Sequence, residues 1–414
     1  MSSSKEKHTL KPKLWIVTEL FYPDQTSTSF IVSKIADKMM EKYDVNVITD
    51  SSLYQENNFS KESNFTIDEG IKVIRVKSKK RDKNNLIQRA MKVVSLSVKL
   101  AKVLFRNVGK GEKVFIVTNP ALLLVFLSWI RNIKKLKLYI LVHDVFPENT
   151  IPTGIIKSES SFLYKLISSI FNRAYSNTDN LIVLGRDMKE VVENKIRKSK
   201  NKPSVHIIEN WGDIDKIKPS STLPDILKER HKNNYITIQY AGNIGRLQGL
   251  ENFLQLFSSS NNKRLYFDLW GGGALTDNLK KWVVDHELEK RVKFHGIYSR
   301  EDQNIILNST DIAVVTLSKG MYGLGVPSKT YNILAAGKPI LFIGDLNSEI
   351  ALLIEESDIG FCFSPDDEKG ITEFLNNLSI EALCELKEKG RNARVLAEEQ
   401  YSEHKILARF IELV

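Results

Sequence analysis

The chain has few cysteines and no long apolar run. Only Cys362 and Cys384 occur among 414 residues, which excludes a disulfide framework and a multi-cysteine metal site and fits a reducing compartment. Residues 1–13 are polar and basic, without the apolar core of a secretory signal. The most apolar stretch, residues 121–130, falls well short of the roughly 20 residues that cross a bilayer, and we interpret it as a buried helix. We therefore expect a cytoplasmic protein.

The charged residues are unevenly distributed. A hydrophobic fraction of 42% with 27% charged residues is typical of a globular protein. Residues 1–210 contain 36 lysines and arginines against 21 acidic residues, whereas the remainder of the chain has a small acidic excess. This asymmetry favours contact of the first half with an anionic surface, either lipid headgroups or nucleic acid, and ordinary solubility is the alternative. No base-reading motif is visible, so we expect no nucleic-acid partner.

Short β-rich runs alternate with helix-length segments through both halves, as in parallel βαβ units. The alternation pauses at residues 210–224, which contain Gly212 and two prolines, and then restarts at Tyr235. The pattern predicts an α/β protein with two tandem, doubly wound, Rossmann-like parallel-sheet domains that face a cleft. The predicted domains are residues 1–208 and 209–395, and residues 396–414 form a closing helix that we interpret as packing back on the first domain. The expected strands are residues 14–21, 45–50, 71–76, 113–118, 138–144 and 180–185 in the first half and 235–242, 264–273, 291–296, 311–317, 338–345 and 360–364 in the second.

A glycine turn after the strand at residues 235–242 is a candidate diphosphate cradle. Gly242 and Gly245 open the turn, Arg246 supplies a cation, and a helix follows from about Gly249. An ordinary strand-to-helix turn is the alternative. The glycine spacing does not match the dinucleotide fingerprint, which argues against a nicotinamide-dependent oxidoreductase.

Two further glycine clusters follow. Residues 271–273 end the strand RLYFDLW and could line the same crevice. In residues 320–339, GMYGLGVPSKTYNILAAGKP, glycines precede Pro327 and Ser328, which are suited to opening a helix, and Lys329 falls in its first turn. A lysine there opposes the helix dipole, which makes sense if an anion binds nearby, and a surface lysine is the alternative.

Together, the motifs AGNIGRLQGLENF, WGGG, FHG and GVPSKTYNILAAGKP, with ELFYPDQTSTSFIVSKIADKM and VHDVFPE in the first half, resemble the retaining GT-B glycosyltransferases of family 4. The likeness is to the bacterial subgroup that builds capsule, O-antigen and other envelope polysaccharides, and it covers nearly the whole chain. It implies a nucleotide diphosphate sugar donor, with uridine as the expected base, and a lipid-linked acceptor of the undecaprenyl-diphosphate type. The donor would lie mostly in the second domain and the acceptor in the first.

The resemblance also assigns roles to residues. In front-face attack with retention, the leaving diphosphate takes the acceptor's proton, and stabilisation of that leaving group carries the catalysis. The implied catalytic residues are His143, Arg246 and Lys329. The implied donor-binding residues are Gly242, Asn243, Gly245, Gly272, His295, Gly296, Ile297, Gly325, Val326, Pro327, Ser328 and Asn332. The implied acceptor-binding residues are Thr26, Ser27, Asp144 and Glu148.

The sequence departs from the family pattern in two places. Many members have two glutamates eight positions apart, where this chain has Leu324 and Asn332, and Asn332 can still hydrogen-bond a ribose hydroxyl. Asn243 and Gln248 replace the usual arginine and lysine beside the glycine turn. The missing glutamates leave open a non-catalytic, nucleotide-binding subunit that regulates or scaffolds a partner glycosyltransferase.

We expect no cofactor and no metal. Asp213 and Asp215 resemble the acidic triplet that binds metal in the other major glycosyltransferase fold, but they fall in the interdomain linker, where acidic residues suit turns.

The segment from Leu86 to Lys110 is a candidate membrane-binding helix. A helical projection places Arg89, Lys92, Lys99, Lys102 and Arg106 on one face, with Ile87, Ala90, Val94, Val98, Ala101 and Phe105 largely opposite. Such a basic face suits anionic headgroups or the pyrophosphate of an acceptor, and a core helix with a solvated face is the alternative. We expect a peripheral protein at the inner face of the cytoplasmic membrane.

Overall fold

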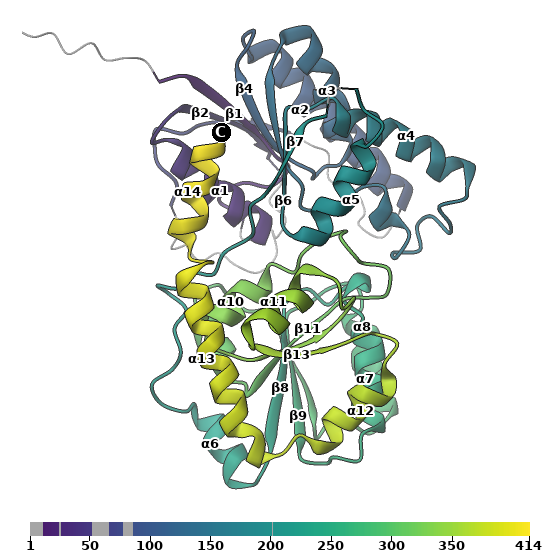
Figure 1. Ribbon diagram of the computed structural model, residues 1–414, viewed down its shortest axis with the longest axis vertical. Helices are drawn as coiled ribbons and strands as arrows, with labels where there is room; N and C mark the ends of the chain where they lie inside the picture. The colour runs from purple at the N-terminus through teal and green to yellow at the C-terminus, as the bar shows by residue number, and fades with distance from the viewer. Residues whose placement is uncertain (1–10, 25, 52–65, 78–85, 201) are drawn as a thin grey trace, which may run out of the picture.

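Two parallel sheets with flanking helices lie one above the other along the long axis of the molecule (Figure 1). The computed structural model describes residues 11–24, 26–51, 66–77, 86–200 and 202–414, without the side chains of residues 86–90. Every strand pair within the described residues is parallel. The predicted class, two tandem Rossmann-like domains, is confirmed.

The N-terminal domain has a seven-stranded sheet in the order β3-β2-β1-β4-β5-β6-β7. Because β1 and β4 are neighbours, the strand order reverses between them, and ligands of such sheets bind beyond the carboxyl ends of strands at such a point. Its elements are β1 (Lys13–Val17), α1 (Ser27–Met39), β2 (Asp44–Asp50), β3 (Lys72–Val76), α2 (Leu86–Asn107), β4 (Lys113–Val117), α3 (Leu122–Lys134), β5 (Lys137–Leu141), η1 (Glu148–Thr150), α4 (Phe162–Ser176), β6 (Asn180–Val183), α5 (Arg186–Ile196) and β7 (Ser204–Ile207).

The C-terminal domain has a six-stranded sheet in the order β10-β9-β8-β11-β12-β13, which reverses between β8 and β11. Its central strand β8 is buried along its whole length, as expected for a strand covered by helices on both faces. Its elements are α6 (Asp225–Lys232), β8 (Ile236–Ala241), η2 (Arg246–Gln248), α7 (Leu250–Ser259), β9 (Leu265–Trp270), α8 (Thr276–Asp285), β10 (Val292–Gly296), α9 (Gln303–Asn308), β11 (Ile312–Thr316), α10 (Lys329–Ala335), β12 (Ile340–Ile343), α11 (Glu349–Ser357), β13 (Gly360–Phe363), α12 (Glu368–Asn377), η3 (Ile380–Ala382) and α13 (Leu383–Glu399).

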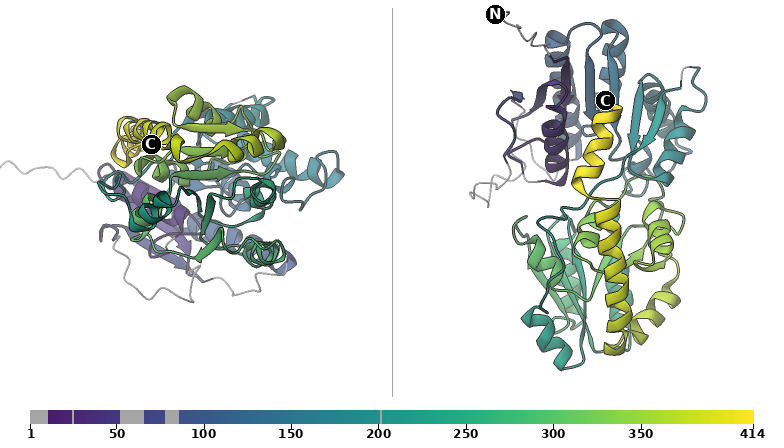
Figure 2. Two further views of the ribbon diagram at one scale, coloured as in Figure 1. Left: turned by 90° about the horizontal axis from the view of Figure 1, so that it is seen from below. Right: turned by 60° about the vertical axis from the view of Figure 1, so that its left-hand side comes forward.

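The last helix, α14 (Glu403–Leu413), leaves the C-terminal domain and packs on α1 of the N-terminal domain (Figures 1 and 2). Phe410 is buried there, with its ring edge-on to Phe115 of β4 at 6.2 Å between centroids. Lys34 of α1 forms an ion pair with Glu403 at 2.8 Å. The chain therefore crosses between the domains twice, once before α6 and once before α14.

The apolar stretch predicted to be a buried helix is only partly buried. Residues Leu123, Leu124 and Leu127 of α3 face the core, but Trp129 is 68% exposed. Ile133, which lies beyond the predicted stretch, is 50% exposed. The prediction was wrong for this outer face because an apolar run does not reveal whether another element covers each side. In the described part of the chain, no helix combines the length and the hydropathy that a membrane span requires.

The apolar residues that were placed opposite the basic face of α2 are partly exposed. The core-facing residues are Leu96, Ser97, Leu100, Ala101 and Leu104, whereas Val94, Val98 and Phe105 are exposed. Helix α2 carries two apolar stripes, and a projection of one isolated helix could not tell which of them meets the sheet.

The predicted basic face of α2 is divided. Lys92 lies 3.7 Å from Glu19, and Lys99 donates to the carbonyl of Lys77 at 2.8 Å. Lys102 and Arg106 are exposed. The side chain of Arg89, like those of Ile87 and Ala90, lies outside the described residues. Of the four basic side chains that the structure describes on this face, Lys102 and Arg106 are thus in place for an anionic partner.

Candidate functional site

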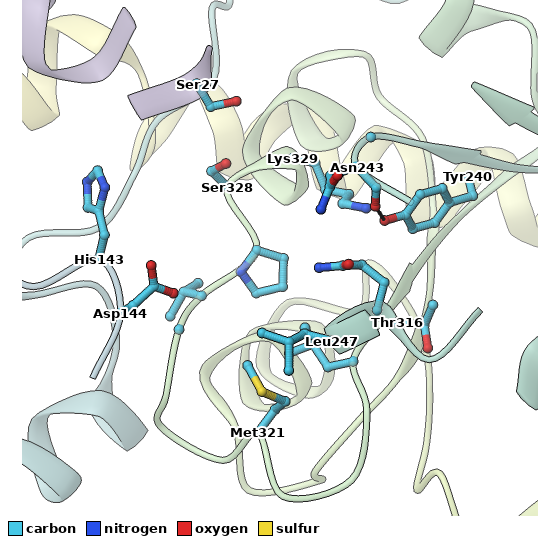
Figure 3. Close-up of a pocket in the computed structure, with 16 residues that line it drawn as sticks. Ser27, His143, Asp144, Tyr240, Asn243, Leu247, Thr316, Met321, Ser328 and Lys329 are labelled. Carbon is cyan, nitrogen blue, oxygen red and sulfur yellow. Dashed lines mark hydrogen bonds between the residues drawn. The ribbon is translucent and has the colours of Figure 1, made fainter. Parts of the chain in front are cut away.

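A cavity of about 280 Å³ lies between the two domains (Figure 3). The strand ends at β8 and β11 form its C-terminal wall, at the reversal of that sheet, and the loop after β5 forms the facing wall. Figure 3 shows His143 and Asp144 on one side, with Tyr240, Asn243 and Thr316 opposite. The cavity is lined by Ser27, His143, Asp144, Tyr240, Gly242, Asn243, Leu247, Gln248, Thr316, Leu317, Met321, Gly325, Val326, Pro327, Ser328 and Lys329.

Lys329 is the charged group that the fold places deepest in this wall. It begins α10, and its Nζ lies 3.4 Å from the centroid of the Tyr240 ring. The amine is buried and has no hydrogen-bond partner among the described residues. Burial lowers the pKa of Lys329 well below its usual value, because a charged ammonium loses its hydration there. An anion in the cavity would supply the missing counter-charge.

Gly242 leaves room for this lysine. Its φ of 153° lies where side-chain-bearing residues are rare, and a Cβ there would lie 3.0 Å from Nζ of Lys329. The turn is fixed by Tyr240, whose hydroxyl donates to the carbonyl of Asn243 at 2.6 Å. The first glycine of the predicted cradle therefore brings the backbone close to the amine.

His143 and Asp144 form the opposite wall. Thr118 at the end of β4 accepts hydrogen bonds from both backbone N–H groups, at 3.1 and 3.3 Å. Nε2 of His143 is buried without a partner among the described residues, and burial lowers the pKa of His143 to about 4. The Asp144 carboxyl is open to the cavity but enclosed by protein beyond it, and this restricted hydration raises its pKa to about 6. The site thus pairs a neutral imidazole with a carboxyl that titrates near neutrality.

A second cluster lies at the ends of β9 and β10. His295 stacks on Trp270 with centroids 4.2 Å apart and planes 8° apart, and its Nε2 is 3.1 Å from Oδ1 of Asp268. Arg230 donates to the other Asp268 oxygen at 2.6 Å. Burial pushes the pKa of Asp268 upward, but the bonds from His295 and Arg230 outweigh it and keep the pKa below its usual value. The ring of His295 is therefore held in a fixed orientation.

The structure brings most of the predicted site residues together. Ten line the cavity: Ser27, His143, Asp144, Gly242, Asn243, Gly325, Val326, Pro327, Ser328 and Lys329. Nine do not line it: Thr26, Glu148, Gly245, Arg246, Gly272, His295, Gly296, Ile297 and Asn332. Sequence reasoning missed Tyr240, Leu247, Gln248, Thr316, Leu317 and Met321. The ends of two neighbouring strands could have indicated Tyr240 and Thr316, because β8 and β11 flank the reversal of the sheet.

Several predicted residues have other partners in this structure. Oδ1 of Asn332 accepts from the backbone N–H of Asp213 at 3.1 Å, and Glu148 accepts from the buried Lys195 at 2.6 Å. Thr26 caps α1. Arg246 is exposed at the start of η2. The roles assigned to these residues stay predictions.

No group of three or more histidine, cysteine, aspartate or glutamate side chains is placed to hold a metal ion within the described ranges.

Comparison with known proteins gives a consistent result. Residues 224–394 match the family model "Glycosyl transferases group 1". The chain is 31% identical over 407 residues to WbjE of Pseudomonas aeruginosa, named a probable glycosyltransferase, with 97% of both chains covered. It is 24% identical over 267 residues to WcaI of Escherichia coli K12, which is named a putative colanic acid biosynthesis glycosyl transferase, with 62% of this chain and 61% of WcaI covered. Among solved structures, Anabaena HepE in complex with UDP superimposes with a TM-score of 0.68 at 15% identity, over 97% of this chain and 99% of HepE.

Proposed function

This chain belongs to the group 1 glycosyltransferases and has the GT-B fold, and we propose that its interdomain cavity transfers a sugar from a nucleotide diphosphate donor to an acceptor. The observation that carries the proposal is the buried, unpartnered amine of Lys329 in a glycine-lined wall at the sheet reversal. A diphosphate bound there would accept from Lys329 and from the backbone N–H groups of the glycine loops.

The donor would be held by the C-terminal domain, with UDP as the nucleotide. The complex of HepE with UDP supports this choice, because the two chains share the fold over nearly their whole length. The stacked pair of Trp270 and His295 at the neighbouring strand ends offers a flat, fixed surface of the kind that a base could contact. The diphosphate would then lie between this pair and Lys329.

The acceptor would enter from the N-terminal wall. We propose transfer with retention, in which the acceptor hydroxyl attacks the anomeric carbon on the face that the diphosphate leaves, and a diphosphate oxygen takes the proton. The Lys329 ammonium, once paired with the diphosphate, would stabilise its growing negative charge. His143, neutral near pH 7, could donate or accept one hydrogen bond to the sugar according to its tautomer.

The acceptor class follows from the relatives and from charge. Because WcaI is named for colanic acid biosynthesis, we propose a family 4 enzyme of envelope polysaccharide assembly, in the capsule or O-antigen class. We propose a lipid-linked acceptor and a position at the inner face of the cytoplasmic membrane, in keeping with the basic excess of residues 1–210.

Thermal-shift measurements with UDP, GDP, dTDP, CMP and NAD test the donor site. We expect one nucleoside diphosphate, UDP, to raise the melting temperature of the wild-type protein. In Lys329→Met this rise should be lost and turnover should fall by about 100-fold, the usual cost of one charge-stabilising donor. The melting temperature without ligand should stay the same or rise, because the substitution removes an unpaired buried amine.

Lys338→Met is the matched control. Lys338 is a second buried lysine, but its Nζ donates to the carbonyls of Asn308 and Thr310 at 3.1 and 2.9 Å. Its loss leaves those carbonyls unpaired, so the unliganded protein should be destabilised while the shift with UDP persists. A wild-type response to UDP in Lys329→Met, or a response of the wild type to NAD alone, would refute the proposed donor site.

A further inference from the structure

The N-terminal domain carries an apolar face that spans three helices. We define it by Val94 and Val98 of α2, Trp129 and Ile133 of α3, and Phe162 and Leu166 of α4. Phe162 is 83% exposed and Trp129 is 68% exposed, whereas such side chains are ordinarily largely buried. Scattered exposed apolar residues are normal, so the arrangement of these six decides whether they form one surface.

The three helices lie side by side. Helix α2 packs on α3, and α3 packs on α4, on one side of the N-terminal domain (Figure 1). The end of α3 reaches α2, where Nζ of Lys134 lies 4.8 Å from the centroid of the Phe105 ring. In each helix, the residues that face the core are not the residues of the apolar face. The core-facing residues are Leu96 and Leu100 of α2, Leu124 and Leu127 of α3, and Phe171 of α4. The exposed residues therefore belong to outer stripes of one continuous helical layer.

The charge on this layer is entirely of one sign. None of the three helices contains an aspartate or a glutamate. The basic residues Lys102, Arg106, Lys165 and Arg173 of α2 and α4 are exposed. Two copies of such a face would repel each other, whereas a surface of anionic headgroups over acyl chains complements both the charge and the apolar side chains.

The loop that leads into α4 contacts the C-terminal domain beside the candidate site. The loop of residues 151–161, which leads into α4, approaches the C-terminal domain at Gly320, where a Cβ would lie 3.7 Å from Cγ of Pro152. The next residue along the chain, Met321, lines the cavity. Phe162, the first residue of α4 and part of the apolar face, directly follows this loop in the chain.

We propose that the apolar face docks onto an anionic lipid bilayer, with Trp129, Phe162 and Leu166 inserted among the headgroups and upper acyl chains. The basic residues around them contact the lipid phosphates. This surface differs from the basic face of α2 predicted from the sequence, because apolar side chains of three helices form its centre. The inference rests on the proposed function in one respect, because the proposed lipid-linked acceptor would be held in the same bilayer.

Vesicle cosedimentation of the full chain tests the proposal. Vesicles of zwitterionic phosphatidylcholine are compared with vesicles that also contain anionic phosphatidylglycerol. We expect binding to the anionic vesicles that weakens as salt is raised, and a drop of at least about tenfold in the double variant Phe162→Ser and Leu166→Ser, since both side chains lose apolar burial. Ile305→Ser is the matched control, because Ile305 is 68% exposed on α9 of the other domain.

Trp129 provides a second readout. Wild-type fluorescence should shift to the blue on anionic vesicles, and Trp129→Phe should still bind but lose most of that shift. Trp15 and Trp211 are already buried, and Trp270 and Trp282 belong to the C-terminal domain. The thermal shift with UDP should be the same in all variants, which separates this inference from the donor site. Equal vesicle binding by the double variant and the wild type would overturn the proposal. So would wild-type dimers that the double variant dissociates, since the face would then be a subunit interface.

Discussion

At the scale of single residues, the candidate site is marked by polar groups that lack partners. Nε2 of His143 and Nζ of Lys329 are both buried without hydrogen bonds among the described residues, on opposite walls of one cavity. The buried amine of Lys195, by contrast, is paired with Glu148. An unsatisfied buried group destabilises a fold, so two of them facing one cavity indicate a ligand that completes both.

The perturbed pKa of His143 gives a testable pH dependence. Burial lowers its pKa in the folded state to about 4, while the unfolded value is near 6.5. Between these values the unfolded chain binds the proton and the folded chain does not, so stability is fully present above about pH 6.5 and is lost as the pH falls toward 4. In His143→Gln this part of the loss of stability in acid should disappear. The free energy of unfolding should then fall by roughly 2 kcal/mol less than in the wild type between about pH 6.5 and pH 4, a figure that allows for partial exposure of the ring.

Urea denaturation of the wild type and His143→Gln from pH 4 to 8 measures this difference. Asp144 has the opposite effect on the free energy of unfolding over an overlapping pH range, because burial raises its pKa in the folded state to about 6 and its contribution to stability grows as the pH falls. Asp144→Asn therefore serves as the control of opposite sign. Parallel curves for the wild type and His143→Gln would show that the imidazole is hydrated and that this wall is open to water.

The sequence predicted those residues whose chemistry shows in a motif, and missed those placed by topology. His143, Gly242 and Lys329 belong to recognisable motifs, and all three line the cavity. Thr316 and Leu317 belong to no motif, and they reach the cavity because β11 lies beside β8. That neighbour relation follows from the crossover connections of the sheet, which a local pattern does not contain.

At the scale of elements, the expected strands were found because parallel strands buried on both faces form runs that are shorter than helices and rich in β-branched and aromatic residues. The outer surfaces of helices were harder to predict. Helices α2 and α3 each have apolar residues on more than one side, and only the packed structure shows which stripe is covered. For this reason the apolar face was not predicted, although all its residues are visible in the sequence.

Helix α14 illustrates an element whose stability depends on a domain other than the one it follows. Phe410 anchors it against Phe115, and both rings are buried. Phe410→Ala should lower the free energy of unfolding by about 3 to 5 kcal/mol, the usual range for a buried phenylalanine. It should also increase amide hydrogen exchange throughout α14, because it removes the aromatic contact of this helix with β4 and leaves the polar contacts, such as Lys34 with Glu403, to hold it.

Phe253→Ala is the matched control for this prediction. Phe253 is equally buried, but it packs on Phe267 inside the C-terminal domain at 5.0 Å between centroids. It should destabilise the protein to a similar extent and leave the exchange of α14 unchanged. Faster exchange of α14 in both variants would mean that the helix simply reports global stability.

At the scale of the whole molecule, contacts between the domains determine the shape of the cavity. The backbone N–H of Val145 donates to the carbonyl of Leu324 at 3.0 Å, and the hydroxyl of Tyr322 donates to Glu190 at 2.7 Å. Arg186 of α5 bonds Glu349 of α11 through its backbone N–H and its guanidinium, at 2.6 to 3.2 Å. These bonds fasten the N-terminal domain to the loop and helices beside Lys329, so the structure represents a closed arrangement of the two walls.

Arg186→Met should weaken this closed arrangement. The Glu349 carboxylate is almost fully buried. Without the guanidinium, the backbone N–H of residue 186 is the one donor of these bonds that remains. Separation of the domains hydrates the carboxylate and therefore becomes more favourable in the variant. Because the proposed donor site needs both walls, the KM for the donor should rise by about tenfold, equivalent to 1.4 kcal/mol, with a smaller change in kcat. Small-angle X-ray scattering should show a larger radius of gyration without ligand, which saturating UDP reverses.

Arg131→Met removes a similar pair, with Asp179 at 2.6 and 2.8 Å, but inside the N-terminal domain, so it should leave the radius unchanged. An unchanged radius and KM in Arg186→Met would mean that α14 and the linker alone set the distance between the domains, and that the contacts beside Lys329 follow from it.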